Sequence, residues 1–333
     1  MGWGPCGPVR TPSRPPCRLS SAAWMPFWRR RADVGTPPSR HPLRSERGWG
    51  WLFVAPAMII IGWFSILPTV ASFLIGFTDW DLLGMPRWVG LDNYRALAAD
   101  PVFYKVMGNT LLFVLLYLVL DLVVALGLAL ALNQKLAGIG IFRTAYFLPV
   151  VTSMVAVSIV WEWIFDPRSG ALNEVLRWVG LGPVPWLADT RTALPALVLM
   201  SVWKSLGTNV VLFLAGLQAL PGEVLESAEV DGATGWTRFR HVTLPLMAPT
   251  VLMVAILASI RAFQTFDSVY IMTHGGPRRS TTVIVYWLFQ NAFTYFKLGK
   301  ASALAYLLFG VLALLTWLQW GLRKRWVHQE QDA

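Results

Sequence analysis

The sequence predicts an all-α membrane protein with six transmembrane helices, and two observations support this fold class. Of the 333 residues, 55% are hydrophobic and only 14% are charged, whereas a soluble domain carries about 25% charged residues. Runs of about 20 apolar residues indicate membrane-spanning helices. Six such runs occur, at residues 51–77, 110–132, 144–165, 193–217, 248–272 and 301–322.

The segments outside these spans divide the chain into a tail, a membrane domain and a short end. Residues 1–48 are rich in Pro, Gly and Arg without helical or strand periodicity, so we expect a disordered, basic N-terminal tail. No apolar core of a signal peptide is visible in this tail. Met25 offers a second start beside Met1, and the choice between them stays open. Residues 49–325 then form the six-helix membrane domain, and 326–333 a C-terminal tail.

The number of spans and the distribution of charge predict the orientation of the chain. An even number of spans puts both termini on one face, and basic residues collect on the cytoplasmic side of a membrane. The net charge of +10 therefore indicates a basic membrane face and not a nucleic-acid partner. We expect a multi-pass protein of the cell membrane with both termini in the cytoplasm. Loop 219–247, between the fourth and fifth spans, then also lies in the cytoplasm.

A polar segment at residues 226–245 interrupts the apolar pattern between the fourth and fifth spans. Pro221-Gly222 is typical of the start of a short helix, and the acidic residues that follow suit the positive N-terminal end of a helix. Gly232 permits a turn that a residue with a side chain would resist. A second short segment, 237–242, is expected to end where Leu244-Pro245 leads into the fifth span.

The spacing in this segment resembles the cytoplasmic coupling loop of ATP-binding-cassette (ABC) importer permeases. The pattern there is Glu-Ala-Ala, three residues, Gly, nine residues, Ile, one residue and Leu-Pro. This chain departs from it only in Ser227 for Ala and Val242 for Ile, which are near in size. The resemblance implies that the segment contacts a partner ATPase through Glu226, Ser227, Ala228, Asp231, Gly232, Ala233, Val242, Leu244 and Pro245.

Between about residues 51 and 322 the chain resembles the carbohydrate-uptake permeases of this superfamily, of the maltose and glycerol-phosphate type. The phrases that carry the resemblance are Gly76-Phe77-Thr78-Asp79-Trp80, Val89-Gly90-Leu91-Asp92-Asn93-Tyr94, Asn109-Thr110, Phe142-Arg143, Leu148-Pro149, Leu214-Ala215-Gly216-Leu217-Gln218, Asp231-Gly232-Ala233 and Gly275-Gly276-Pro277. The resemblance implies the type I ABC importer permease fold and import of a sugar or sugar derivative. It also implies a heterodimer with a second permease subunit, an ABC ATPase dimer that binds ATP and Mg²⁺, and an extracytoplasmic solute-binding protein.

Several polar side chains lie inside the predicted spans, where a charge must face protein or water. Lys204, Ser205 and Thr208 share one face of a helix, and the same spacing places Arg261, Thr265 and Ser268 together. By position these faces match the helices that line the sugar site in the permeases that this chain resembles. The candidate substrate pathway is therefore Lys204, Ser205, Thr208, Arg261, Ala262 and Thr265, with Trp203, Phe263 and Phe266 as adjacent aromatic surfaces. Alternatively, these groups only bind the second permease subunit.

Asp121 in the second span is interpreted as a hydrogen-bonding group across a helix interface, in preference to a residue that relays protons or binds a cation. Which sugar is carried stays open. The cations Lys204 and Arg261 favour an acidic or phosphorylated solute, unless Asp267 neutralises one of them, and a neutral oligosaccharide is an equally good candidate.

The sequence shows few of the motifs that are typical of an enzyme. The histidines lie apart without metal-ligand spacing, so no metal site is expected. No phosphate-binding loop of the Gly-x-x-x-x-Gly-Lys-Ser/Thr type occurs, so this chain is expected to need no cofactor and ATP hydrolysis is expected in partner subunits. The alternative function is a secondary transporter driven by an ion gradient, which would usually show internal repeats, and none is visible. Residues 283–293 are too short to span and are expected to form an interfacial helix.

Overall fold

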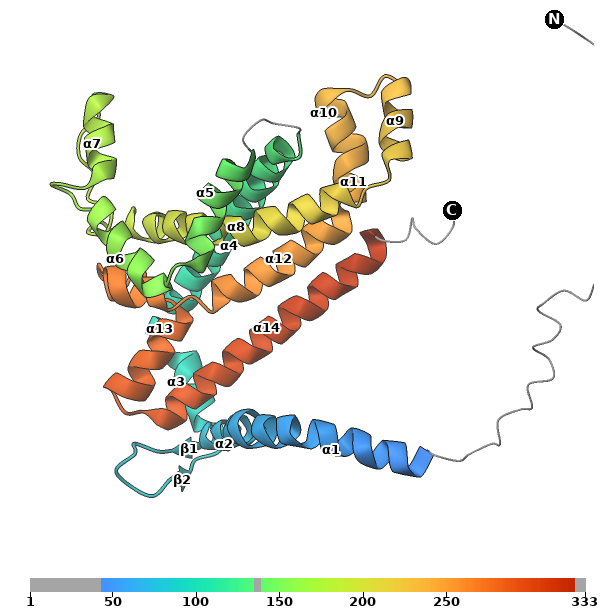
Figure 1. Ribbon diagram of the computed structural model, residues 1–333. Helices are drawn as coiled ribbons and strands as arrows, with labels where there is room; N and C mark the ends of the chain where they lie inside the picture. Colours follow the sequence, from blue (N-terminus) through green and yellow to red (C-terminus); the bar gives the residue numbers. More distant parts are fainter. Residues whose placement is uncertain (1–42, 135–138, 327–333) are drawn as a thin grey trace, which may run out of the picture. The chain divides into compact units, whose positions relative to one another are not determined.

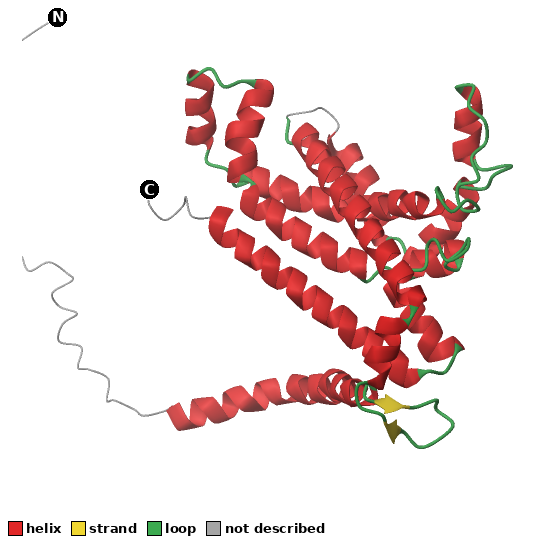
Figure 2. Ribbon diagram, turned by 180° about the vertical axis from the view of Figure 1, so that it is seen from behind, coloured by secondary structure: helices red, strands yellow, loops and turns green. Residues whose placement is uncertain are grey.

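The computed structural model describes residues 43–134 and 139–326 of the chain. Most of the predicted tails, residues 1–42 and 327–333, lies outside these residues. The expectation of disorder is wrong for residues 43–48, which form the start of the first helix, and Trp326 is the last residue of the final helix and not part of a tail. The described chain is helical apart from one two-stranded hairpin (Figures 1 and 2). It divides into a first compact unit that ends at Ser65 and a second unit that begins at Ile66.

The elements follow in chain order. They are α1 (Leu43–Ile61), η2 (Gly62–Ile66), α2 (Leu67–Ile75), β1 (Thr78–Asp79), β2 (Arg87–Trp88), α3 (Asp92–Ala99), α4 (Pro101–Leu132), α5 (Ile139–Val151), α6 (Met154–Ile164), α7 (Ala171–Trp178), α8 (Ala193–Gln218), α9 (Gly222–Val230), α10 (Gly235–Arg238), η3 (Phe239–Thr243), α11 (Leu244–Leu246), α12 (Ala248–Phe263), η4 (Val269–Thr273), α13 (Ile284–Phe289), η5 (Gln290–Thr294) and α14 (Leu298–Trp326), where η denotes a π-helical turn. The strands β1 and β2 pair antiparallel, with Thr78 opposite Trp88.

Within residues 43–134 and 139–326, four helical segments are long and apolar enough to cross a membrane, and two bent helix pairs bring the number to six if each pair counts as one span. The four are Trp49–Ile75, Pro101–Leu132, Ala193–Gln218 and Leu298–Gly321. The second of these begins nine residues before the predicted 110–132 because Asp100 caps it, accepting a hydrogen bond from the backbone nitrogen of Val102 at 2.9 Å, and Pro101 suits the first helical position.

The third predicted span, 144–165, is not one continuous helix. It consists of α5 and α6, which meet at an angle of 106°. Ser153 adopts an extended conformation with φ −63° and ψ 138°, which ends the helical path before α6. Pro149, in the last turn of α5, cannot donate a backbone hydrogen bond and favours such a break.

The fifth predicted span, 248–272, is also interrupted. Helix α12 ends at Phe263, and the π-helical turn η4 begins only at Val269. The expectation that Arg261, Thr265 and Ser268 share one face of a continuous helix is therefore wrong, because Thr265 lies in the interruption.

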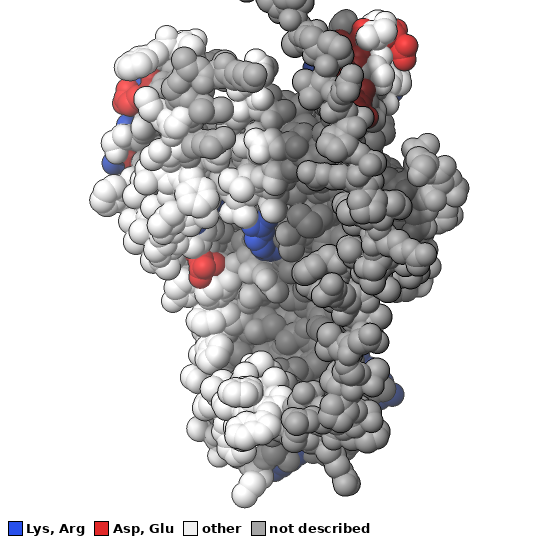
Figure 3. Space-filling model, turned by 45° about the vertical axis from the view of Figure 1, so that its right-hand side comes forward, with Lys and Arg blue, Asp and Glu red and all other residues white. Residues whose placement is uncertain are grey.

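Helices α4, α5, α8 and α12 form the centre of the second unit. Small residues let their backbones approach closely, as is common between helices in membranes. A Cβ atom on Gly207 of α8 would lie 2.5 Å from the carbonyl oxygen of Tyr146 in α5. A Cβ atom on Gly216, also of α8, would lie 2.7 Å from the side chain of Thr250 in α12. These two glycines therefore allow α8 to pack closely against α5 and α12. Most of the described surface on the face in Figure 3 is uncharged, as contact with lipid requires.

Residues 283–293 form a short helical segment, as the sequence predicts, and most of its side chains are buried within the chain, although Phe293 is exposed. Ile284 is 1% exposed and Trp287 is 4% exposed, and α13 packs against α4 and α14. The backbone nitrogen of Ile284 donates to the hydroxyl of Thr110 in α4 at 2.9 Å. The first part of the segment, up to Phe289, is almost wholly apolar, which is typical of a buried helix.

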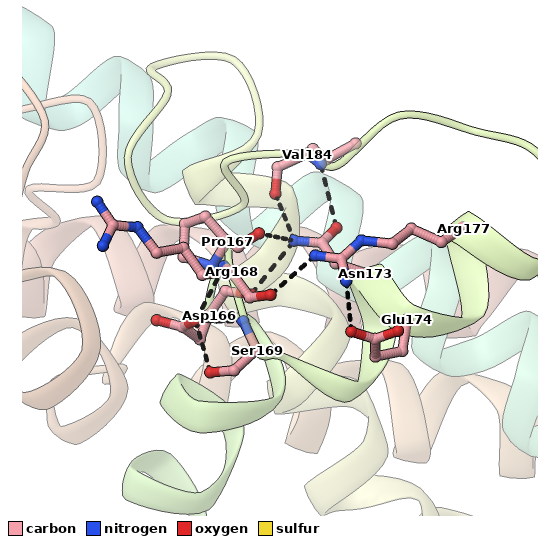
Figure 4. A network of polar contacts seen from close by, with 8 residues as sticks. All are labelled: Asp166, Pro167, Arg168, Ser169, Asn173, Glu174, Arg177 and Val184. Carbon is pink, nitrogen blue, oxygen red and sulfur yellow. Dashed lines mark hydrogen bonds and ion pairs between the residues drawn. The ribbon is translucent and has the colours of Figure 1, made fainter.

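The segment from Asp166 to Val184, which contains helix α7, is a closely hydrogen-bonded connection between α6 and α8 (Figure 4). The carboxylate of Asp166 accepts from the backbone nitrogens of Ser169 at 2.7 Å and Arg168 at 2.9 Å. These N–H groups hold the pKa of the Asp166 carboxyl below its usual value. Asn173 is fully buried, and its amide exchanges two hydrogen bonds with the backbone of Val184 at 3.0 and 3.1 Å.

We expect Asn173→Ala to open this connection. The variant loses at least two buried hydrogen bonds, which together contribute roughly 2 kcal/mol, so the open fraction should rise about thirtyfold. Limited trypsin digestion of the detergent-solubilised protein, with cleavage after Arg177 and Arg191 as the readout, measures the change. Glu174→Ala is the matched control, because its ion pair with Arg177 is exposed and such pairs contribute about 1 kcal/mol or less. Cleavage of Asn173→Ala at the wild-type rate would contradict the assignment.

Candidate functional site

One cavity of 260 Å³ brings together all six residues predicted for the substrate pathway. It lies between α4, α5, α6, α8 and α12. Its wall is formed by Lys204, Ser205, Thr208, Arg261, Ala262 and Thr265, together with Tyr117, Val150, Met154 and Ser201. Thr265 reaches the cavity from the interruption after α12, not from a helix face.

A buried polar network crosses the wall of this cavity. Asp121 on α4 is fully buried, and both of its carboxylate oxygens accept a hydrogen bond from α8, one from the Ser205 hydroxyl at 2.6 Å and one from the Asn209 amide at 2.5 Å. The amide oxygen of Asn209 accepts from Nη2 of Arg261 on α12 at 2.6 Å. Asp121 thus has the interhelical hydrogen bonds expected of it.

The network also shows which acidic residue offsets the positive charge of Arg261. A charge inside a span needs a partner within the protein, and the Asn209 amide links the guanidinium to the Asp121 carboxylate. Asp267 does not take this role. Its side chain is exposed, and it forms no ion pair with a described cation.

The Lys204 side chain caps the C-terminal end of α5. The break after Val151 leaves carbonyl groups of the last turn without helical donors. The Lys204 ammonium donates to the carbonyl oxygens of Pro149, Val150 and Thr152, the last two at 3.2 and 2.6 Å. An ammonium has three donors, so all of them are used, and its charge suits the negative end of a helix. Lys204 therefore lines the cavity without a free N–H group for a solute.

Two buried polar atoms in the cavity wall have no hydrogen-bond partner among the described residues, the Ser201 hydroxyl oxygen and Nε of Arg261. Ser201 is 7% exposed. It lies one helical turn before Ser205, and this i, i+4 relation is the signal that could have placed it on the pathway from the sequence. The hydroxyls of Thr208 and Thr265, which are half-buried in the same wall, can donate to or accept from the hydroxyl groups of a solute.

The aromatic residues expected beside the pathway lie outside this cavity. Trp203 packs against Trp161 in a T-shaped pair, with ring centroids 5.6 Å apart, and lines a separate groove of 370 Å³ with Leu148 and Pro149. Phe263 is 3% exposed in the core, and Phe266 packs against Tyr270 and Phe289.

The loop between α8 and α12 contains the turn predicted at Gly232. Helix α9 ends at Val230, and Gly232 follows with φ +82°, in the left-handed region that favours glycine. Its nitrogen donates to the Glu229 oxygen at 3.1 Å, and the Ala233 nitrogen donates to the Ala228 oxygen at 2.9 Å. This pair of bonds is a Schellman motif, which fixes the direction in which the chain leaves α9.

The side chains of this loop are largely accessible. Among the predicted coupling residues only Ala228 is buried, at 9% exposure. Glu226, Ser227, Asp231, Gly232 and Pro245 are exposed, and Ala233, Val242 and Leu244 are half-buried. An ion pair of 3.0 Å between Glu229 and Arg238 joins α9 to α10. The loop therefore presents a formed helix with free polar side chains.

The second half of the loop differs from its prediction. The expected segment 237–242 is part of a longer helical path through α10, η3 and α11, and Leu244-Pro245 does not end it. Pro245 lies in the first turn of α11, where its missing N–H is tolerated. The path instead turns by 70° between Leu246 and Ala248.

Comparisons with known proteins place these features in context. Residues 123–327 match the family model described as binding-protein-dependent transport system inner membrane component. The chain is similar to the probable ABC transporter permease protein YesP of Bacillus subtilis, with 36% identity over 293 residues, 86% of this chain and 94% of that protein. It is also similar to the lactose transport system permease protein LacF of Rhizobium radiobacter, with 34% identity, 81% of this chain and 92% of that protein.

Among solved structures, a bacterial alginate ABC transporter in complex with an alginate pentasaccharide-bound periplasmic protein shares the fold. One of its chains superposes with a TM-score of 0.75 over 86% of this chain and 98% of its own length, at 22% sequence identity.

We expect Lys204→Met to destabilise the junction of α5 and α6. The methionine keeps most of the stem but removes the ammonium. The Pro149 oxygen keeps the Thr152 hydroxyl as a donor at 2.7 Å, whereas the Val150 and Thr152 oxygens lose the bonds from Lys204. The expected cost is about 2 kcal/mol, which corresponds to a fall in melting temperature of about 3 °C. Scanning fluorimetry of the detergent-solubilised protein measures this change. Lys297→Met, which replaces an exposed lysine, should melt at the wild-type temperature. An unchanged melting temperature for Lys204→Met would show that other groups satisfy these carbonyls.

Proposed function

Because this chain belongs to the family of binding-protein-dependent transport system inner membrane components, we propose that it forms one half of the membrane channel of an ATP-driven importer of a sugar or sugar derivative. The observation that carries the proposal is the coupling loop, residues 219–247. It presents a formed and accessible helix, α9, between the two helices α8 and α12 that line the cavity.

The position of α9 favours mechanical coupling over chemistry in this chain. Exposed Glu226, Ser227 and Asp231 provide a surface for an ABC ATPase dimer, which would bind ATP and Mg²⁺. Since α9 is joined to α8 on one side and through α10 and α11 to α12 on the other, closure of the ATPases can draw α9 inward as a rigid lever. The two cavity-lining helices then rock and alternate access to the cavity between the two faces of the membrane.

The remaining partners follow from surfaces that this chain leaves uncovered. On helix α4 of the second unit, the apolar side chains of Leu115, Val119 and Val123 are 59%, 55% and 66% exposed. A second permease subunit and lipid would cover such faces, and that subunit would supply the opposite wall of the pathway. A solute-binding protein would deliver the sugar to the outer face, with both termini of this chain in the cytoplasm.

A sugar is favoured by the chemistry of the cavity. The polar residues of its wall carry hydroxyls and N–H donors, with Thr208 and Thr265 half-buried and Ser201 and Arg261 beside them. Such groups bind sugar hydroxyls. The relative named for lactose transport supports the same class of solute.

We expect Gly232→Pro to uncouple the transporter while leaving it assembled. Proline fixes φ near −65°, which is incompatible with φ +82° at this position, so α9 should be misdirected. The spans satisfy their own backbone hydrogen bonds and should insert normally. Reconstitution of the complete complex in proteoliposomes with loaded binding protein measures ATP-dependent sugar uptake, which should be lost.

The matched control is Gly222→Ala, because Gly222 begins α9, has no positive φ and has no atom within 4 Å of an added Cβ. It should keep wild-type uptake. Wild-type uptake by Gly232→Pro would mean that the loop is only a connector. Uptake by the unchanged complex that requires an ion gradient and not ATP would favour a secondary transporter instead.

A further inference from the structure

The two opposite charges buried between α4, α8 and α12 belong to one chain of hydrogen bonds. Asp121 and Asn209 are both fully buried. Asp121 uses one carboxylate oxygen for Ser205 and the other for Asn209, and Asn209 passes the contact on to Arg261. Asp121 lies on α4, Asn209 on α8 and Arg261 on α12. The network therefore fixes the positions of these three helices at the depth of the cavity.

The chemistry of an amide explains why this order matters. An asparagine side chain has a donor end and an acceptor end. The Asp121 carboxylate accepts and the Arg261 guanidinium donates, so only one orientation of Asn209 satisfies both neighbours. Asp121 therefore holds the Asn209 amide oxygen toward Arg261 and anchors Nη2 of the guanidinium. Nε of Arg261 keeps no partner among the described residues.

The same contacts determine the charge that the cavity offers to a solute. A guanidinium without an acidic neighbour is a binding group for carboxylates and phosphates. Here Asp121 offsets it. Lys204, the other cation in the wall, has its donors on three carbonyl groups. Among the described residues no acidic side chain lines the cavity itself, and Asp121 lies behind its wall, bonded to the lining residue Ser205.

We propose that Asp121 is a specificity-determining residue of the transport pathway. Through Asn209 it holds Arg261 in place and offsets its charge, so that the pathway takes an uncharged saccharide in preference to an acidic one. The assignment rests on the proposed function of this cavity. Asp121 acts through Asn209 and Arg261 and is a positioning residue that need not touch the sugar.

The test compares the affinities of a neutral and an acidic sugar for the complete transporter complex. The complex is placed in lipid nanodiscs without the binding protein, so that only the membrane subunits select. The probes are lactose, maltose and cellobiose, each beside its counterpart with a carboxylate at C6. Ligand-observed NMR titration suits weak binding and gives the ratio of the two dissociation constants.

Asp121→Asn keeps the shape of the side chain and removes its charge. We expect it to shift the ratio at least tenfold toward the acidic sugar. Arg261→Gln leaves Asp121 without its cation and should shift the ratio at least tenfold the other way. In the double variant both charges are gone, and the ratio should return to within about twofold of wild type. Asp267→Asn, the same change at an exposed acid outside the cavity, should leave the ratio unchanged.

An unchanged ratio in an assembled Asp121→Asn complex would overturn the proposal, and so would a shift that persists in the double variant. If Asp121→Asn fails to assemble, the opposite shift of Arg261→Gln decides, and its absence counts against the proposal. Adding Asn209→Asp to Asp121→Asn moves the acid next to Arg261 and should restore both assembly and the neutral preference. If the unchanged complex binds no sugar and imports none with ATP, the proposed function itself has failed.

Discussion

The constraint on which this structure depends is that polar groups inside a membrane must find their partners within the protein, and helix α8 supplies most of those partners. Its Lys204 satisfies the carbonyl groups at the broken end of α5. Its Ser205 and Asn209 satisfy the Asp121 carboxylate of α4, and Asn209 also receives Arg261 from α12. The third span can break, and charged groups can lie beside the cavity, because helix α8 supplies hydrogen-bond partners in both places.

The same helix connects the cavity to the coupling loop. Gly207 and Gly216 of α8 permit close approach to α5 and α12, so α8 cannot shift without moving its neighbours. At its end, Gln218 leads into the loop whose helix α9 is accessible. In the proposed mechanism, a displacement of α9 is transmitted to the residues that surround the cavity. Packing, rather than any single bond, provides that transmission.

The sequence predicted features that depend on local chemistry. It did not predict where the path of a helix bends. Apolar runs located the spans, because lipid demands them whatever path the helix takes. Gly232 was predicted correctly, since a left-handed turn has a strong local signature. The breaks at Ser153 and Gln264 were missed because hydropathy sums do not record a bend. Leu244-Pro245 was read as a stop, although a proline in the first turn of a helix is tolerated.

The candidate site shows the same division. The resemblance to carbohydrate-uptake permeases, applied by position along two spans, grouped six residues that the structure brings into one cavity. The distance of Asp121 in sequence hid its bond to Ser205. Asp267 was considered as the partner of Arg261 because it is near in sequence, whereas the partner comes from α4 through Asn209. The burial of residues 283–293 likewise depends on α4 and α14, which no local pattern reveals.

The central claim is that α9 is the contact through which an ATPase moves this subunit, and photo-crosslinking from α9 tests it most directly. A photoreactive amino acid replaces Ser227, which is exposed on α9, in the assembled complex in native membranes. The account predicts a crosslinked product that contains this subunit and the ATPase, identified by mass spectrometry. A product that contains only lipid, or no ATPase under any nucleotide condition, would contradict it.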